Sequence, residues 1–389
     1  MIAHRATGSL LPFALFYFWT FAYSGLFGPF WGLYLDSLRF SSWQIALLIS
    51  LSTLARIVAP GFWGWLADRQ GRRRPIILLS SLASVLGFAL ICLHDKTFAW
   101  MFVWLALVHF FWSAALPLVE ASTAWLTRAQ PGRYSQVRVW GSIGYLLMAL
   151  LGGYLLEHWP LASVPWLVLA LLALIALAAY GLPETETPAQ AETAGSLAAT
   201  LRQPAVMVLF GCCFLMAFAF GPYYTFYSIG LKNAGYDKSL IGWLWALGVL
   251  CEIAVFWLMP RIMRRMALER LMLLSLVCAV LRFALIALAI DRPLWALSAQ
   301  LLHAPTFALH HAAAIGLIHR YFALAQQAQG QGLYIIASFG VGGSAGGLLA
   351  GALWDQGGVA LVFALSALAA ALGVGLCCCG LSAKTTVAD

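Results

Sequence analysis

Five ionisable side chains stand inside long apolar stretches of the sequence. They are Arg56, Glu120, Arg138, Glu252 and Arg282. A charge at the middle of a membrane costs about 2.5–3.5 kcal/mol on insertion scales, so such residues normally face the interior of a helix bundle and have partners. Carboxylates there can carry protons, and an arginine can bind a carboxylate through two parallel hydrogen bonds. The pattern predicts a substrate or proton pathway, with structural ion pairs as the alternative.

Glu120 and Arg138 are separated by eighteen positions. Glu120 continues a polar stripe with His109, Ser113 and Thr127 through an otherwise apolar segment. We predict that Glu120 and Arg138 form a buried pair that also receives the substrate. For Arg138, which is close to a loop, the alternative is a side chain that reaches the membrane surface.

A second polar stripe lies in segment 293–319, at Gln300, His303, Thr306 and His310. Pro305 is expected to bend this segment, because proline removes a helical hydrogen bond. A histidine such as His303 can relay protons near neutral pH. For His310 and His311 we favour structural hydrogen bonds between helices. No acidic or cysteine side chain accompanies these histidines at coordinating spacing, so we expect no metal site.

The elements that must position these residues are membrane-spanning helices. Of the 389 residues, 63% are hydrophobic and 9% are charged, whereas soluble domains have about 25% charged residues. A helix needs about 20 apolar residues to cross a bilayer. Twelve segments qualify: 10–35, 43–66, 75–94, 97–126, 136–157, 161–181, 204–231, 240–260, 269–290, 293–319, 329–353 and 358–380. They show no alternating polarity, which argues against a β-barrel.

The net charge of +8 is not a nucleic-acid signature, because the arginines cluster in alternate loops. The loops after even-numbered segments hold Arg69, Arg72, Arg73, Arg74, Arg128, Arg133, Arg202, Arg261, Arg264, Arg265, Arg270 and Arg320. The positive-inside rule therefore places both termini in the cytoplasm. The bilayer is the expected partner, and nucleic acid is not.

The sequence also repeats itself. "FGPFWGLY" at 27–34 returns as "FGPYYTFY" at 220–227, 193 residues later, and a Pro-, Ala-, Thr- and Glu-rich stretch lies between. We predict two six-helix halves, 1–181 and 204–389, joined by a cytoplasmic linker at 182–203. A central site that opens alternately to either side is typical of this architecture.

Aromatic residues of the repeated segments could hold a flat ring. Four of them are candidates for substrate binding, with packing or a place at the membrane interface as the alternative: Trp31, Tyr34, Tyr223 and Tyr227.

The loop "GWLADRQGRRRP" at 64–75 resembles the loop signature of the major facilitator superfamily. Gly64, Asp68, Arg69, Gly71, Arg72 and Arg73 match it without a gap. The resemblance implies an all-α membrane protein of twelve transmembrane helices in two pseudo-symmetric halves, in which these six residues latch one conformation. Gly64 would allow close helix approach. An ordinary basic loop is the alternative.

Three further segments resemble the phenylpropionate and lactose permeases of that superfamily. They are "QVRVWGS" at 136–142, "GWLWALGVLCEI" at 242–253 and "QLLHAPTF" at 300–307. This resemblance implies a proton symporter of the bacterial inner membrane, with Glu120, Arg138 and Arg56 at the substrate and Glu252, Arg282 and His303 in proton coupling. The lactose permease's glutamate and lysine in the last segment are replaced by Thr306 and Gln300. Glu252 is then the one carboxylate left in the second half's membrane core.

The five charges in the apolar stretches sum to one excess positive charge, which a carboxylate could balance and a sugar could not. The charge count thus favours an anion, and the resemblance implies proton-coupled import of an aromatic carboxylate such as phenylpropionate. We expect a monomer that needs no cofactor besides the proton gradient. A sugar or nucleoside symporter is the alternative. A drug or metabolite exporter is another, although 136–157 lacks the proline of exporter signatures. No nucleophile and base stand at catalytic spacing, so we do not expect an enzyme.

Overall fold

The computed structural model describes residues 10–128, 130–185 and 197–381. All regular elements in these residues are helices, which confirms the predicted fold class. Eleven helical stretches are long and apolar enough to cross a membrane. The last, Leu324–Gly380, has 57 residues and a non-helical turn at Gly358 (φ 53°), so it is long enough for two crossings.

By its internal contacts the chain divides into two compact units. The N-terminal unit is Met1–Ala189 with Asp237–Trp243, and the C-terminal unit is Gln190–Tyr236 with Leu244–Asp389. The middle of the predicted linker, 186–196, lies outside the described residues. The same holds for 1–9 and 382–389, on which the prediction of two cytoplasmic termini falls.

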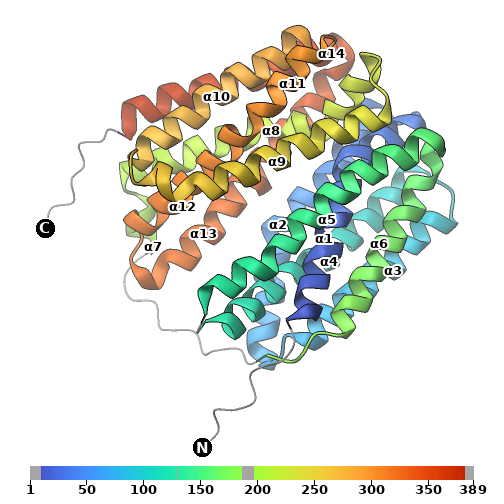
Figure 1. The fold of residues 1–389 in the computed structure, drawn as a ribbon, viewed down its shortest axis with the longest axis horizontal. Coiled ribbons are helices and arrows are strands. Elements are labelled where there is room, and N and C mark those ends of the chain that lie inside the picture. The colour runs from blue at the N-terminus through green and yellow to red at the C-terminus, as the bar shows by residue number, and fades with distance from the viewer. Residues whose placement is uncertain (1–9, 129, 186–196, 382–389) are drawn as a thin grey trace, which may run out of the picture. The chain divides into compact units, whose positions relative to one another are not determined.

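The helices of the N-terminal unit are α1(Leu11–Ser37), α2(Ser42–Gln70), α3(Arg74–Leu93), α4(Phe98–Thr127), α5(Pro131–His158), η1(Leu161–Ser163) and α6(Val164–Tyr180). α1 packs against α5 and α6, and α3 packs against α4 and α6 (Figure 1). Glycine allows the closest approach: a Cβ added to Gly144 would lie 2.1 Å from the Phe18 carbonyl oxygen. Small residues set such backbone contacts in membrane bundles.

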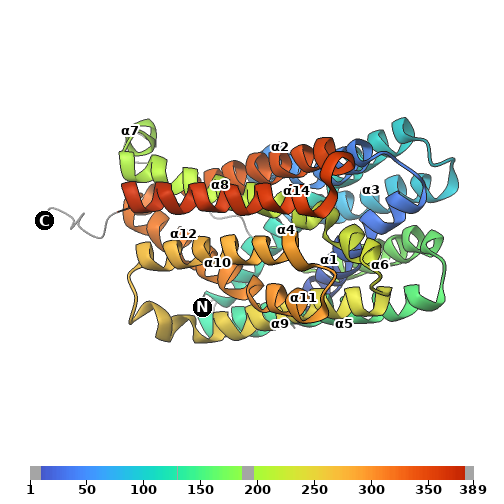
Figure 2. The same ribbon diagram turned by 90° about the horizontal axis from the view of Figure 1, so that it is seen from above.

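The C-terminal unit has more irregular helices, and it includes α9 from Leu244 onward: α7(Leu197–Leu201), α8(Pro204–Asn233), α9(Lys238–Met263), α10(Leu268–Ala289), α11(Pro293–Leu301), η2(Pro305–Leu309), α12(His310–Tyr321), η3(Leu324–Gln326), α13(Gln327–Ile335), η4(Ile336–Gly342) and α14(Gly343–Gly380). α14 packs against α8 and α10 (Figure 2). The contact again depends on glycine, since a Cβ on Gly346 would lie 2.0 Å from the Phe218 carbonyl oxygen.

Two segments of the C-terminal unit are π-helical. η2 begins at Pro305, where an irregularity was expected, and η4 separates α13 from α14. Proline has no backbone N–H and therefore cannot donate a helical hydrogen bond. A π-helical turn, which is wider than an α-helical turn, accommodates the missing bond.

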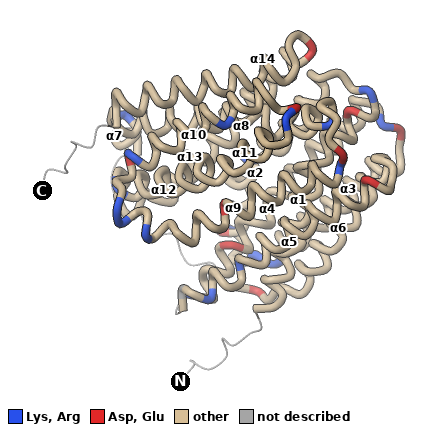
Figure 3. The backbone as a smooth tube through the Cα atoms, turned by 45° about the horizontal axis from the view of Figure 1, so that its top comes forward, with Lys and Arg blue, Asp and Glu red and all other residues tan. Residues whose placement is uncertain are grey.

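Basic residues of the C-terminal unit gather at the end where α7 and α12 lie (Figure 3). This follows from the chain order, because α9 ends, α10 begins and α12 ends beside arginines: Arg261, Arg264, Arg265, Arg270 and Arg320. The middle parts of the helices carry little charge.

Candidate functional site

The five ionisable residues differ widely in exposure, and the expectation that all five are buried is wrong. Arg282 is fully buried. Glu252 is 20% exposed, Arg138 and Glu120 are 31% and 39% exposed, and Arg56 on α2 is exposed. The reason is the high cost of removing a charge from water, which long side chains avoid by ending at a surface of their unit.

Glu120 and Arg138 form the predicted pair in the N-terminal unit. Arg138 Nε lies 3.5 Å from Glu120 Oε1, joining α5 to α4. The guanidinium also lies over two rings of α1, 4.1 Å from the centroid of Phe21 and 5.3 Å from that of Tyr17. The Tyr17 hydroxyl donates to Thr123 Oγ1 at 3.3 Å. Arg138 is therefore held by a carboxylate and two aromatic faces.

Gly141 makes room for this arrangement, and sequence reasoning gave it no role. A Cβ at Gly141 would lie 2.8 Å from Phe21 Cδ2 and 3.0 Å from Arg138 Nη1. A larger residue would push the guanidinium away from its ring. The signal was in the sequence, since Gly141 belongs to the "QVRVWGS" segment that carried the resemblance.

Trp31 and Tyr34 lie far along α1 from this pair. Fourteen residues separate Tyr17 from Trp31, which is about 20 Å of helix. Trp31 is 1% exposed and packs against the rings of Phe27 and Phe88, at 4.9 and 5.6 Å between centroids. The structure does not bring these aromatic residues together with Glu120 and Arg138.

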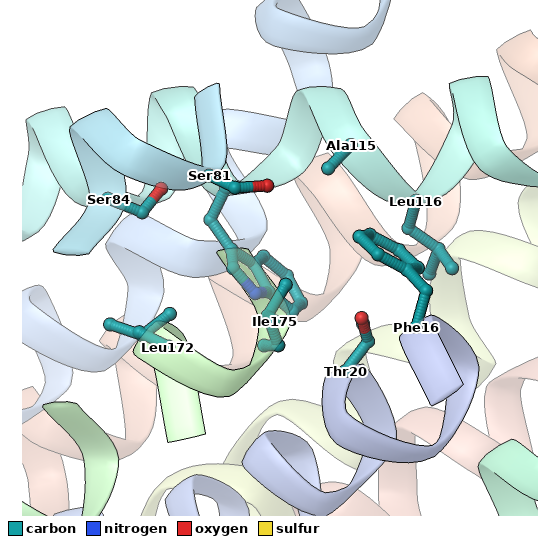
Figure 4. A pocket seen from close by; sticks show the side chains of 9 residues that line it. Phe16, Thr20, Ser81, Ser84, Ala115, Leu116, Leu172 and Ile175 are labelled. Carbon is teal, nitrogen blue, oxygen red and sulfur yellow. The ribbon is translucent and has the colours of Figure 1, made fainter. Parts of the chain in front are cut away.

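The N-terminal unit also has a small cavity between α1, α3, α4 and α6. Figure 4 shows Thr20 from α1 and Ser81 and Ser84 from α3 among its apolar lining. Both serines donate to backbone carbonyls of their own helix, while Thr20 Oγ1 has no hydrogen-bond partner in the described part of the chain. Glu120 and Arg138 do not line this cavity.

Arg282 of α10 is the centre of the polar cluster in the C-terminal unit. Its Nε donates to the Ala299 carbonyl oxygen at 3.2 Å. Nη1 and Nη2 have no hydrogen-bond partner among the described residues. The guanidinium lies against three rings, with centroids at 4.2, 5.0 and 5.2 Å: Tyr223, Phe220 and Phe283. Aromatic faces stabilise the cation, but they leave two strong donors unused.

Other polar side chains around Arg282 also have atoms without a hydrogen-bond partner. The Tyr223 hydroxyl donates to Gln300 Oε1 at 3.2 Å, and Gln300 Nε2 is unpartnered within the described chain. The same is true of the Tyr227 hydroxyl. Gly248 leaves space for this network, because a Cβ there would lie 3.0 Å from Gln300 Oε1. Phe220 and Trp245 also belong to the cluster and were not singled out from the sequence.

Glu252 and His303 connect α9 to the same cluster. His303 Nε2 lies 3.6 Å from Glu252 Oε2, which is ion-pair distance if the imidazole is protonated. The His303 ring is 5.7 Å from the ring of Tyr223. The structure thus brings together Glu252, His303, Arg282, Tyr223 and Tyr227, five of the predicted site residues, within one unit.

His310 and His311 make hydrogen bonds between helices, as we favoured from the sequence. His310 Nδ1 lies 3.2 Å from Ser275 Oγ on α10, and His311 Nδ1 lies 3.3 Å from the Tyr334 hydroxyl on α13.

The predicted latch residues surround the turn between α2 and α3. Gly71 ends α2 with φ 64°, a left-handed conformation that glycine adopts at little cost. Asp68 and Arg72 are exposed, and Arg69 lies 5.6 Å from the Trp65 ring. Within the described part of the N-terminal unit, the close helix approach expected of Gly64 is not found, because a Cβ there would meet no heavy atom within 4 Å.

Glu184 completes this turn and was treated only as linker sequence. Its Oε1 accepts from the backbone N–H of Arg73 at 2.9 Å and of Arg74 at 3.2 Å, at the N-terminus of α3. A carboxylate is favourable at this positive end of a helix. Burial lowers the pKa of the Arg73 guanidinium, and the charges of Asp68 and Glu184 act in the opposite direction. The next residue, Thr185, shares a hydrogen bond of 2.7 Å with Ser122 of α4.

Comparison with known proteins supports the resemblance seen in the motifs. The profile of the MFS_1 like family matches residues 10–365. A probable 3-phenylpropionic acid transporter of Escherichia coli (strain K12) is 30% identical over 325 residues, which are 80% of this chain and 82% of the relative. A maltose permease of Geobacillus stearothermophilus is 28% identical over 73% of this chain and 72% of its own length. The crystal structure of the nucleoside transporter NupG aligns with a TM-score of 0.81 at 16% identity, covering 96% of this chain and 99% of that one, and shows a shared fold.

Proposed function

The chain belongs to the MFS_1 like family and is a multi-pass secondary transporter, not an enzyme, and we propose that it imports a small aromatic carboxylate together with protons. The proposal includes a monomer in the bacterial inner membrane, with both termini in the cytoplasm and no cofactor besides the proton gradient.

The observation that carries the proposal is the environment of Arg282. A fully buried guanidinium keeps its positive charge, and its desolvation is costly unless an anion compensates it. Nη1 and Nη2 have no hydrogen-bond partner in the described chain, and the donor Gln300 Nε2 of the same cluster is also free. Two parallel guanidinium donors match the geometry of a carboxylate. A neutral sugar would leave the charge uncompensated.

Proton coupling follows from the same cluster. With Glu252 ionised, the cluster already contains a negative charge beside His303. When Glu252 takes up a proton, the cluster loses this negative charge, its net charge becomes more positive, and an anionic substrate binds more tightly. By linkage, the bound anion then raises the affinity for the proton by the same factor. Symport requires this mutual stabilisation, and Glu252 and His303 are the groups we propose to carry the proton.

The aromatic part of the substrate is suggested by two facts. A relative at 30% identity is named as a probable 3-phenylpropionic acid transporter. The rings of Phe220, Tyr223 and Tyr227 surround the guanidinium side of the cluster. Glu120 and Arg138 of the N-terminal unit remain proposed contacts of the substrate.

A nucleoside is the second candidate, because a nucleoside transporter shares the fold and another relative, a putative nucleoside transporter of Escherichia coli (strain K12), is 27% identical over 71% of this chain. Flat bases also suit aromatic walls. Export is the remaining alternative on this fold.

The test is uptake into proteoliposomes that contain the purified transporter. We expect radiolabelled 3-phenylpropionate to accumulate when the outside is made acidic, and a nucleoside or maltose not to accumulate. Glu252→Gln should abolish accumulation but retain exchange of labelled for unlabelled substrate. A wild-type protein that exchanges the acid but never concentrates it in a proton gradient would exclude symport. Uptake of a nucleoside and not of the acid would favour the second candidate.

A further inference from the structure

The C-terminal unit contains a cavity that adjoins the Arg282 cluster. It lies between α8, η2, α12, α13 and η4. Both π-helical segments border it, and such segments often mark functional sites. Seven aromatic rings line it: Phe220, Tyr224, Phe307, His310, His311, Tyr334 and Phe339.

The rings on one wall are aligned in parallel. Phe307 stacks with His303 at an interplanar angle of 4° and with His311 at 3°, with centroids 6.0 and 6.2 Å apart. Phe220 belongs to the cavity and also lies 5.0 Å from the Arg282 guanidinium carbon. The Phe220 ring is therefore shared by the cavity lining and the surroundings of the Arg282 cation. A flat ligand ring in the cavity could keep an attached carboxylate close to Arg282.

His310 adds one polar group to this lining. The hydroxyl of Ser275 donates to the Met272 carbonyl oxygen at 2.7 Å. A hydroxyl has a single hydrogen, so a Ser275 hydroxyl that donates to Met272 accepts from His310 Nδ1, at 3.2 Å. His310 Nδ1 then carries the proton, and Nε2 of the neutral ring is an acceptor. Nε2 is buried and has no hydrogen-bond partner among the described residues.

A purely structural role accounts for only one of the two ring nitrogens of His310. The bond to Ser275 joins α12 to α10 through Nδ1, but it leaves Nε2 as a buried acceptor, which is unfavourable unless a donor arrives. His311 and Tyr334 of the lining bond each other, and Thr306 and Ser338 donate to carbonyls of their own helices, whereas His310 Nε2 has no partner among the described residues. The aromatic lining together with this acceptor selects for a ring that carries a hydroxyl group.

We propose that this cavity is the subsite for the aromatic ring of the substrate, and that His310 Nε2 accepts a hydrogen bond from a hydroxyl group on that ring. The preferred substrate is then a hydroxyphenyl-substituted carboxylate rather than the unsubstituted acid. This inference rests on the proposed function, because it assumes an aromatic acid as substrate.

The test compares the binding of 3-phenylpropionate with that of its 3-hydroxyphenyl and 4-hydroxyphenyl analogues to the purified full-length protein, by titration calorimetry. We expect one hydroxylated acid to bind about 3- to 10-fold more tightly than the unsubstituted acid, the range of one neutral hydrogen bond. His310→Leu should remove this preference by weakening only the hydroxylated acid. His310→Gln, which retains an acceptor, should preserve part of it. His109→Leu replaces an equally buried histidine of the N-terminal unit and should leave the ratio unchanged.

The ring subsite is tested separately. Phe307→Leu and Phe339→Leu should weaken both aromatic acids several-fold but not hexanoate, and Phe210→Leu, on α8 outside the cavity, should weaken neither. Equal binding of all three aromatic acids by the wild type, or an unchanged preference in His310→Leu, would overturn the role of His310. Unchanged binding in both phenylalanine variants would overturn the subsite. A wild-type protein that binds a nucleoside and no aromatic acid would instead refute the proposed function.

Discussion

In the N-terminal unit an arginine faces a glutamate, with Arg138 Nε 3.5 Å from Glu120 Oε1, whereas the C-terminal unit buries Arg282 with two nitrogens lacking any hydrogen-bond partner among the described residues. The first pair is neutral in itself and about one-third exposed. The second cation is surrounded by aromatic rings. The difference is that the N-terminal cation has a carboxylate beside it, whereas two nitrogens of the C-terminal cation are open to a hydrogen-bond acceptor, such as the anion that we propose.

The repeated segments show the same division. At an offset of 193 residues, Phe30 and Tyr34 correspond to Tyr223 and Tyr227. In the first repeat the rings pack in the core, as Tyr34 does against Trp31 at 5.0 Å. In the second, Tyr223 lies 4.2 Å from the Arg282 guanidinium. The duplicated scaffold therefore holds packing in one unit and a polar cluster in the other.

The largest loss of stability is expected from substituting the glycines that allow close contact between helix backbones, a feature that both units share. In Gly144→Val the new Cβ would lie 2.1 Å from the Phe18 carbonyl oxygen. In Gly346→Val it would lie 2.0 Å from the Phe218 carbonyl oxygen. Because the backbones of the two helices in contact must move apart, we expect each substitution to lower the free energy of unfolding by about 3 kcal/mol or more and to remove most of the folded protein. Yield of monodisperse protein in detergent measures this. Gly28→Val is the control, since a Cβ at Gly28 meets nothing within 4 Å.

Arg282→Gln should have the next largest effect. Losing the charged donors should weaken binding of 3-phenylpropionate about 10- to 100-fold, the range of a hydrogen bond to a charged group. Arg282→Lys should be intermediate, because an ammonium lacks the planar fork. Removing an uncompensated buried charge should not lower the Tm of the ligand-free protein. Binding calorimetry and thermal unfolding measure the two effects; a drop in Tm with unchanged affinity would show that Arg282 is structural.

The comparison also shows how much the sequence could predict. Hydropathy predicted the position of every long helix. A helix that crosses a bilayer needs about 20 apolar residues, and the order of these residues does not matter for recognising it. The Glu120 and Arg138 pair was also predictable, because two opposite charges in apolar segments need partners. The burial of the charged residues was not predictable. It depends on which side of a helix faces its neighbours and on how far a side chain reaches, so that Arg56 is exposed and Arg282 is buried.

Contacts made by irregular segments were harder still to foresee. Glu184 accepts two backbone hydrogen bonds at the N-terminus of α3 from a stretch whose composition indicates only a linker. In the C-terminal unit, whose equivalent loop lacks the signature, Glu269 pairs with Arg320. No local pattern encodes these partners, since they are 111 and 51 residues apart.

A double-mutant comparison tests whether the N-terminal pair is satisfied. Arg138→Ala leaves Glu120 without its cation, so protein yield and substrate binding should both fall, the latter by about fivefold, within the range for a partly exposed ion pair. Adding Glu120→Ala should restore yield but not binding. Yield in detergent and calorimetry provide the readouts. Normal binding by the double variant would make the pair purely structural, and normal binding by Arg138→Ala would remove it from the substrate site.

The smallest effects are expected at the turn between α2 and α3. Asp68→Asn should slow transport about 3- to 10-fold while changing substrate affinity less than twofold, because a latch acts on the conformational step that limits turnover. Glu184→Gln should act in the same direction but more weakly, since a neutral amide still accepts from the N–H groups of Arg73 and Arg74. Initial uptake rates at saturating substrate, with affinity measured on the same preparations, separate the two quantities. Weaker affinity at an unchanged rate in Asp68→Asn would mean that this turn communicates with the substrate site and is no latch.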